Sequence, residues 1–233
     1  MLDAVIFDKD GTLFEFRASW GAWTDSVLVE LASDAADAAR LGRVLGYDPE
    51  KCSFAKDSPV ISMTTPEIAD ILHRHLTGIS LTALNDRLNA LSVAAPMMPA
   101  VDLRAVLGGL KARGLKIGLA TNDTEHPARV HLEKAGVLDL FDYVAGCDSG
   151  WGGKPAPGQL LEFVRRFGLT PARVAMVGDS LHDLDAGRAA GMHAVAVLTG
   201  MAGHDDLAGH ADVVLADIGG LGAWIDRQGA ALA

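Results

Sequence analysis

Apolar runs of strand length recur along the chain without the polar alternation that a half-exposed strand shows. Such continuous runs are typical of strands that are buried on both faces of a sheet. Glycine or a group of polar residues follows most of the runs, which indicates a turn at that point. The six predicted strands are Ala4–Phe7, Lys116–Ala120, Tyr143–Ala145, Val174–Val177, Ala194–Leu198 and Val213–Leu215.

Helical periodicity separates these runs in the second part of the chain, from Pro99 onward. Each predicted helix ends at a glycine, which is the usual residue just beyond a helix C-terminus. Because strands and helices alternate, the sequence predicts a parallel sheet and the α/β fold class. The four predicted helices are Asp102–Arg113, Glu125–Ala135, Pro157–Phe167 and Leu181–Ala190.

The segment between the first strand and Pro96 breaks this alternation, because it contains no convincing strand. Helices are predicted there on both sides of an irregular stretch at residues 47–65. We therefore expect an all-helical domain at residues 16–96, inserted into a core that residues 1–15 and 97–233 form. The four predicted helices of this insertion are Trp20–Ala32, Asp34–Gly46, Pro66–His75 and Leu81–Leu91.

The composition is that of a globular chain, and the charge limits the classes of partner that it can bind. Hydrophobic residues make up 49% of the 233 residues, and charged residues make up 21%. The formal net charge of -10, with no cluster of lysine and arginine, disfavours nucleic acid and anionic membranes as partners. No apolar stretch approaches the ~20 residues of a membrane-spanning helix, and no signal-peptide pattern is present. Cys52 and Cys147 lack metal-binding spacing, so we expect a soluble cytoplasmic protein with reduced thiols.

Polar residues gather where the predicted strands end, which is the edge at which parallel sheets bind ligands. Asp8 and Asp10 follow the first strand, and Asp179 and Asp183 follow the fourth. Clustered carboxylates repel one another and lose hydration, so a cation among them would stabilise their charged forms. Mg²⁺ takes hard oxygen ligands and commonly shares a phosphate with its substrate. We therefore expect Mg²⁺ on the side chains of Asp8 and Asp179 and on the backbone carbonyl of Asp10.

The other polar residues at these strand ends suit a phosphate group. Thr121 and Asn122 follow the second strand and Lys154 follows the third, so all three could donate to phosphate oxygens. Gly11 allows a sharp turn after the two aspartates, and backbone amides in such a turn can face an anion. Thr12 continues the turn and is a further candidate for substrate binding.

Four segments together resemble the motifs of the haloacid dehalogenase superfamily, in the order of that family. The resemblance covers the whole chain and is greatest to its phosphoglycolate phosphatase-like members. It implies a Rossmann-like core with a helical cap, Mg²⁺ as the cofactor and hydrolysis of a small phosphorylated metabolite. The four segments are DKDGTL (Asp8–Leu13), TND (Thr121–Asp123), KPAP (Lys154–Pro157) and GDSLHD (Gly178–Asp183).

The resemblance also implies a role for each motif residue. Asp8 would be the nucleophile that forms an aspartyl-phosphate, and Asp10 would protonate the leaving oxygen and then activate water. Thr121 and Lys154 would stabilise charge on the phosphoryl oxygens. Asp183 would support the metal site through water or through the other ligands.

The sequence leaves the substrate and part of the function open. Phosphoglycolate is the first candidate substrate. A phosphomutase of the β-phosphoglucomutase type is an alternative function, and a non-catalytic binding protein on the same fold is another. Arg17, at the entry to the cap, and Lys56, in its irregular middle, are candidates for contacts with substrate. The oligomeric state, monomer or homodimer, is open as well.

Three further expectations concern residues near these motifs. Lys9 should point away from the metal, because neighbouring residues of a strand alternate in direction. Trp20 is expected in the core of the cap rather than as a platform for substrate. Most histidines are expected at the surface, namely His126, His131, His193, His204 and His210.

Overall fold

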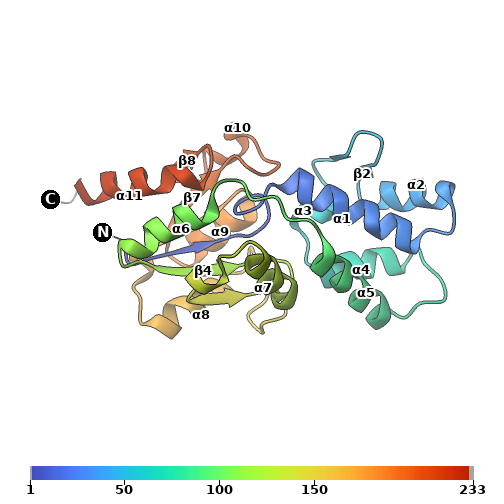
Figure 1. Ribbon diagram of the computed structural model, residues 1–233, viewed down its shortest axis with the longest axis horizontal. Helices are drawn as coiled ribbons and strands as arrows, with labels where there is room; N and C mark the ends of the chain where they lie inside the picture. The colour runs from blue at the N-terminus through green and yellow to red at the C-terminus, as the bar shows by residue number, and fades with distance from the viewer. Residues whose placement is uncertain (1, 231–233) are drawn as a thin grey trace.

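The computed structural model describes residues 2–230, which form a sheet with flanking helices and a separate group of helices (Figure 1). Among these residues, six parallel strands form one sheet in the order β5-β4-β1-β6-β7-β8. The predicted α/β class is therefore confirmed, and each predicted strand lies within one residue of its observed bounds. The strands are β1 (Ala4–Phe7), β4 (Lys116–Ala120), β5 (Tyr143–Ala145), β6 (Val174–Gly178), β7 (His193–Val197) and β8 (Val213–Leu215).

Alternate residues of β1 pack on opposite faces of this sheet. Val5 and Phe7 belong to one hydrophobic cluster, and Ala4 and Ile6 belong to another. Because all four are completely buried, β1 has no polar face, which is why its sequence is a continuous apolar run. The helices of the first cluster are α6 (Leu103–Ala112), α7 (Glu125–Lys134) and α11 (Leu221–Ala230), and those of the second are α8 (Gly158–Phe167) and α9 (Leu181–Ala189).

Short helical segments complete the sheet-containing part of the chain. They are the α-helix α10 (His204–Leu207) and the 3₁₀ helices η1 (Leu138–Leu140), η2 (Pro171–Arg173) and η3 (Ile218–Gly220). Within residues 2–230, none of the helices is both long enough and apolar enough to cross a membrane.

The segment between β1 and α6 has a hydrophobic cluster of its own, which includes Trp23 and Leu72. In Figure 1 its helices lie at the opposite end of the molecule from the two termini. The stretch that the sequence predicts to be irregular contains a two-stranded antiparallel pair and a short helix, so this segment is not all-helical. Its elements are α1 (Phe16–Leu31), α2 (Ala35–Val44), β2 (Tyr47–Asp48), β3 (Ser53–Phe54), α3 (Pro59–Ser62), α4 (Thr65–His73) and α5 (Leu81–Ala94).

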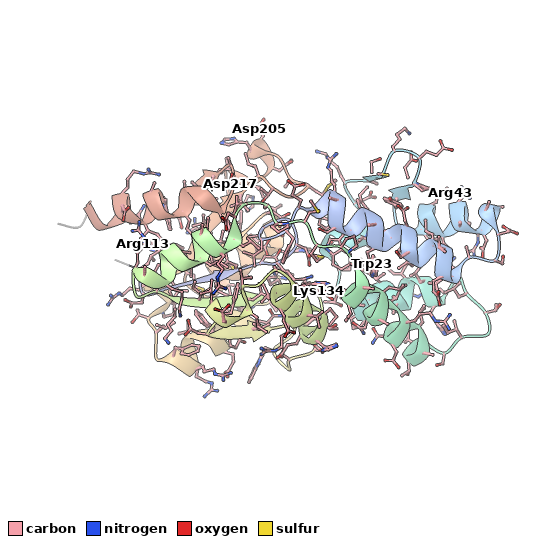
Figure 2. The ribbon with its side chains drawn as sticks, in the orientation of Figure 1. Trp23, Arg43, Arg113, Lys134, Asp205 and Asp217 are labelled. Carbon is pink, nitrogen blue, oxygen red and sulfur yellow. The ribbon has the colours of Figure 1, made fainter. Side chains whose placement is uncertain are left out.

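Two neighbouring stretches of chain connect these helices to the sheet. The backbone amide of Glu15 donates to the carbonyl of Met98 over 2.8 Å, and Phe14 forms an isolated β-bridge with Pro99. Lys134 of α7 also bridges the two parts, because its ammonium group donates to the carbonyl of Val93 in α5 over 2.7 Å (Figure 2). Two adjacent connecting stretches, and contacts between α5 and α7, therefore attach the helical segment to the core.

The register of the sheet aligns the carboxyl ends of its central strands. Phe7 of β1 lies opposite Leu119 of β4 on one side and opposite Val177 of β6 on the other. The residues that follow these three strands consequently leave the sheet at the same edge. That edge faces the helical segment, and the polar motif residues meet there.

Candidate active site

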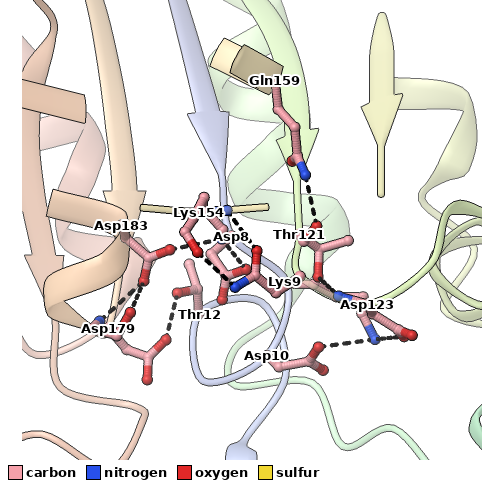
Figure 3. A network of polar contacts seen from close by, with 12 residues as sticks. Asp8, Lys9, Asp10, Thr12, Thr121, Asp123, Lys154, Gln159, Asp179 and Asp183 are labelled. Carbon is pink, nitrogen blue, oxygen red and sulfur yellow. Dashed lines mark hydrogen bonds and ion pairs between the residues drawn. The ribbon is translucent and has the colours of Figure 1, made fainter. Parts of the chain in front are cut away.

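Three carboxylates meet beyond the ends of β1 and β6 (Figure 3). Asp8 follows β1, Asp179 follows β6, and Asp183 lies in the first turn of α9. One oxygen of each carboxylate lies within 4.8 Å of the other two. All three side chains are buried, and the structure thus brings together three carboxylates that the sequence places at the strand ends.

The buried carboxylates lack enough positive charge around them. Burial raises the pKa of Asp8 to about 7, although the neighbouring Lys154 opposes this shift. Burial and the charge of Asp183 raise the pKa of Asp179 well above its usual range. A raised carboxyl pKa means that the charged form is disfavoured where it stands. A cation among the three carboxylates would remove this penalty.

The surroundings of Asp179 leave space for its carboxylate only because glycines line them. A Cβ atom on Gly11 would lie 2.3 Å from Oδ2 of Asp179, and a Cβ atom on Gly200 would lie 1.6 Å from the same oxygen. Gly11 also has a φ angle of +84°, which residues with a side chain rarely adopt. The three carboxylates offer oxygen ligands alone, and this donor set fits Mg²⁺. The contribution of the Asp10 carbonyl to such a site stays a prediction.

Lys154 neutralises part of this charge. Its ammonium nitrogen lies 2.5 Å from Oδ1 of Asp8 and 2.7 Å from Oδ1 of Asp183. Burial alone would lower the pKa of Lys154, but the two carboxylates raise it above its usual value, so the lysine stays charged. The other oxygen of Asp183 accepts from the backbone amide of Ser180 over 3.0 Å and from its hydroxyl over 2.7 Å. Both oxygens of Asp183 are therefore fixed.

Asn122 positions Lys154 rather than facing a phosphate. Its Oδ1 accepts from the backbone amide of Lys154 over 2.7 Å, and its Nδ2 donates to the carbonyl of Lys154 over 3.0 Å. The same Nδ2 donates to the carbonyl of Ser62 in α3 over 2.9 Å. Both amide hydrogens are thus in use, so the prediction that Asn122 donates to the phosphate is wrong for this structure. The residue instead connects the core to the helical segment.

Two other predicted phosphate contacts also have different partners. The backbone amide of Gly11 donates to the carbonyl of Phe14 over 2.7 Å, so this amide does not face an anion. The hydroxyl of Thr12 donates to Oδ1 of Asp179 over 3.3 Å and orients that carboxylate. Thr121 does line the cavity, and its hydroxyl oxygen accepts from the amide of Asp123 over 3.1 Å. This bond uses the oxygen as an acceptor, so the hydroxyl hydrogen of Thr121 can serve a phosphate.

Lys9 is completely buried and places its charge beside Asp10. Its ammonium nitrogen lies 3.1 Å from Oδ2 of Asp10 and 2.9 Å from Oδ2 of Asp123. These partners lie outside the three-carboxylate group, in keeping with the expected alternation along the strand. Burial raises the pKa of Asp10, and the charge of Lys9 opposes that shift. Oδ1 of Asp10 is buried and has no hydrogen-bond partner of ordinary geometry among residues 2–230, so it can bind a substrate atom.

His131 is a further hydrogen-bond partner of Lys9. Its Nδ1 accepts from the Lys9 ammonium over 3.0 Å, and its Nε2 donates to the carbonyl of Ser92 in α5 over 2.7 Å. Burial lowers the pKa of His131 to about 4, which keeps the ring neutral. The prediction that this histidine lies at the surface is wrong, because α7 packs against α5. The sequence gives one indication of this contact. Lys9 lies between two aspartates, which implies that further hydrogen-bond acceptors lie near its ammonium group.

A cavity separates the polar motif residues from the helical segment. It has a volume of about 50 Å³ and opens to solvent. Trp20 lines it while also belonging to the hydrophobic cluster of the helices, so it is both a core residue and a cavity wall. Arg17 and Lys56 are exposed and do not line it, so the structure gives no support to them as substrate contacts. The lining from the helical segment comes from Phe16, Trp20, Val60, Ile61, Ser62, Met63, Thr65 and Ile68.

The arrangement as a whole suits transfer of a phosphoryl group. Asp8 offers a carboxylate oxygen at the cavity floor, and Lys154 places a positive charge next to it. Asp10 lines the same cavity with an unpartnered oxygen that can exchange a proton. A nucleophile, a proton donor and a charge-stabilising group therefore surround one space.

Comparisons with known proteins agree with this chemistry. Residues 2–191 match the family model of the haloacid dehalogenase-like hydrolases. The chain is 31% identical to a phosphoglycolate phosphatase of Rhodospirillum rubrum, over 99% of this chain and 96% of the relative. It is 30% identical to a phosphoglycolate phosphatase of Nitrosospira multiformis, over 84% of this chain and 83% of the relative. The crystal structure of CbbY from Rhodobacter sphaeroides in complex with phosphate superposes with a TM-score of 0.66 at 21% identity, covering 95% and 97% of the two chains.

Proposed function

Because the chain belongs to the haloacid dehalogenase-like hydrolases and is a phosphatase, we propose that it hydrolyses a small phosphate monoester through a phosphoryl group carried on Asp8. The observation that carries this proposal is the position of Asp8. Its carboxylate lies 2.5 Å from the Lys154 ammonium, within the three-carboxylate group and at the floor of the cavity. A carboxylate in such surroundings is a suitable nucleophile for a phosphate ester.

In the first step, an oxygen of Asp8 attacks phosphorus and the bond from phosphorus to the ester oxygen breaks. Asp10 gives its proton to that leaving oxygen, so the alcohol departs neutral. In the second step, Asp10 takes a proton from a water molecule that attacks the same phosphorus. The bond between phosphorus and Asp8 breaks, and inorganic phosphate and the Asp8 carboxylate result.

The surrounding groups stabilise charge during both steps. Lys154 and the hydroxyl of Thr121 contact the phosphoryl oxygens as negative charge shifts among them. Asp8 and Asp179 are the residues that would hold Mg²⁺ through their carboxylates. Asp183, whose oxygens accept from Lys154 and Ser180, would support the site beside them. When bound there, Mg²⁺ supplies positive charge to the phosphoryl group and to the carboxylates.

We propose residues 16–96 as a cap over a core that residues 1–15 and 97–233 form. The separate hydrophobic cluster of this segment and its paired connections at Phe14 and Pro99 support the division. The cap supplies the cavity wall opposite Asp8, so it would exclude water while the phosphoryl group is transferred. The exposed Cys52 and the partly buried Cys147 are free thiols, which supports a cytoplasmic location.

The test is release of phosphate from p-nitrophenyl phosphate, with Mg²⁺ or with EDTA. We expect release by the wild type with Mg²⁺ and loss of at least ~10³-fold in Asp8→Asn, because the amide is not a nucleophile. Asp205→Asn is the matched control, since this aspartate is fully exposed and does not line the cavity. Equal release by wild type and Asp8→Asn would contradict the proposal.

A further inference from the structure

The two sides of the cavity differ in chemistry. The floor carries a strong negative charge, of which Lys154 balances only a part with bonds to Asp8 and Asp183. Lys9, beneath the floor, is engaged with Asp10 and Asp123. The charged residues that line the floor are Asp8, Asp10, Asp123, Asp179, Asp183 and Lys154.

The wall that the cap contributes is mainly apolar. Phe16 and Trp20 are buried there, with their rings stacked at a centroid distance of 6.5 Å and an interplanar angle of 27°. Val60, Met63 and Ile68 continue the apolar surface. Because Phe16 and Trp20 also pack within the hydrophobic cluster of the cap, the wall has a fixed shape.

This wall contains a hydrogen-bond donor that can bind an uncharged group of the substrate. The indole Nε1 of Trp20 is buried and lies near Asp10, whose charged form it favours, but among the described residues it makes no hydrogen bond of ordinary geometry. Because this N–H group has only a poorly aligned neighbour in Asp10, a ligand atom that accepts its hydrogen bond would be stabilised. An ether, hydroxyl, amide or carbonyl oxygen of the substrate can do this without bringing charge.

A second negative charge on the substrate has no second lysine or arginine as a partner, and the other basic residue of the described lining is His182. Among the described residues that line the cavity, Lys154 is the only lysine or arginine, and it serves the phosphoryl end. A carboxylate on the organic part would lie against the apolar wall or near the aspartates of the floor. The first position disfavours it through lost hydration, and at the second the charges of Lys9 and Lys154 are already engaged by aspartates.

We propose that the preferred substrate is a phosphate monoester of a compact, uncharged alcohol, whose apolar surface contacts Phe16 and Trp20 and whose oxygen accepts from Trp20 Nε1. The proposal rests on the phosphatase function proposed above and specifies the substrate of the same site. It sets this chain apart from the activity named for its relatives, because phosphoglycolate carries a carboxylate.

A matched pair of substrates tests the charge requirement. Phosphoglycolate and its amide, phosphoglycolamide, have nearly the same shape and differ in the charge of one group. We expect kcat/KM for the amide to exceed that for phosphoglycolate by at least tenfold at pH 8, with p-nitrophenyl phosphate as the reference ester. Equal values, or a higher value for phosphoglycolate, would overturn the proposal.

A cation placed on the wall should reverse the preference. Met63 is 43% exposed and lines the cavity, so Met63→Lys adds an ammonium group without filling a packed core. We expect the ratio of phosphoglycolate to phosphoglycolamide kcat/KM to rise at least fivefold in this variant. Leu161→Lys is the control, because Leu161 is equally exposed at 43% and lies outside the cavity. The same rise in both variants would overturn the assignment of the wall.

Removal of the donor tests the second part of the proposal. Trp20→Phe keeps an aromatic ring and deletes Nε1, so kcat/KM for phosphoglycolamide should fall at least fivefold relative to p-nitrophenyl phosphate. An unchanged ratio would overturn the role of Nε1. If the wild type released phosphate from none of the three esters, the phosphatase function itself would be overturned, and the proposal with it.

Discussion

The ammonium nitrogen of Lys9 lies 3.1 Å from Oδ2 of Asp10, and the lysine side chain is completely buried. Asp10, the carboxylate proposed to give and take the proton, is therefore held by a lysine charge that is shielded from water. Burial lowers the pKa of Lys9, but Asp10 and Asp123 raise it above its usual value, so the charge persists. One oxygen of Asp10 is fixed by this contact while the other remains available to the substrate.

Replacement of Lys9 by methionine should destabilise the fold strongly. The methionine side chain would fill similar space, but Asp10 and Asp123 would lose the cation between them and remain as buried charges. We expect the free energy of unfolding in urea to fall by about 3–5 kcal/mol, as when one partner of a buried ion pair is removed. The double variant Lys9→Met with Asp123→Asn removes one of these charges and should recover part of the loss. A loss below about 1 kcal/mol in Lys9→Met would contradict the prediction.

Replacement of Asp10 by asparagine should slow hydrolysis to an extent that depends on the leaving group of the substrate. p-Nitrophenolate departs without a proton, whereas an alkoxide of a simple alcohol needs one in the transition state. We expect kcat/KM to fall about 10²–10⁴-fold for propyl phosphate and at least tenfold less for p-nitrophenyl phosphate. Steady-state phosphate release measures both. An equal loss for the two esters would show that Asp10 acts mainly on the attacking water or on the fold.

The motif residues could be predicted from the sequence because each follows a strand whose apolar run is unmistakable. Parallel strands end at one edge, so Asp8 and Asp179, which follow the neighbouring strands β1 and β6, had to come together, whereas Lys154 reaches them from the loop after β5. The partners of the hydrogen-bond donors were harder to predict. Whether Asn122 faces a phosphate or the backbone of Lys154 depends on how a loop folds back, and residue type is the same in both cases.

The parts that escaped prediction depend on packing between distant segments. His131 is buried because α7 lies against α5, with Ser92 and Lys9 as its partners. No local pattern in the sequence distinguishes it from an exposed histidine of the same helix, such as His126. The helix α11 was also not predicted, although Leu221, Trp224 and Ile225 have the spacing of a buried helical face.

Asp179→Asn should change stability in opposite directions with and without metal. The folded-state pKa of Asp179 lies above that of the unfolded chain, so its contribution to stability is lost as pH rises through the folded-state pKa. At pH values above the pKa of the unfolded chain, the aspartate therefore destabilises the metal-free protein, and the neutral amide does not. We expect a higher Tm for Asp179→Asn than for wild type in EDTA at pH 8, by about 2–4 °C for each kcal/mol gained.

Magnesium should reverse this order. Mg²⁺ is expected to raise the Tm of the wild type, because an ion that binds the folded state alone stabilises it. Asp179→Asn lacks one of the carboxylates, so its rise should be much smaller at the same concentration. Thermal melts of both proteins, in EDTA and across a Mg²⁺ series, measure this. Equal Mg²⁺-dependent shifts would contradict the assignment of Asp179 as a ligand.

His131 should make stability depend on pH between about 6.5 and 4. Its pKa is about 4 in the folded protein against 6.5 for the ordinary side chain, so protons bind the unfolded chain more readily. The contribution is therefore complete above pH 6.5 and is lost as pH falls toward 4, up to roughly 3 kcal/mol. Protonation would add a charge beside Lys9 and would remove the acceptor at Nδ1, 3.0 Å from the Lys9 ammonium.

The measurement is the difference in unfolding free energy between pH 7 and pH 4.5, obtained in urea for wild type and for His131→Gln. Glutamine can still accept from Lys9 and donate to Ser92, but it does not titrate. The other titrating groups are common to both proteins, so the wild type should lose about 2–3 kcal/mol more than the variant. His126→Gln is the control, because His126 is an exposed histidine on the same helix and should leave the difference unchanged. If His131→Gln lost as much stability as the wild type, His131 would not be held neutral by its burial.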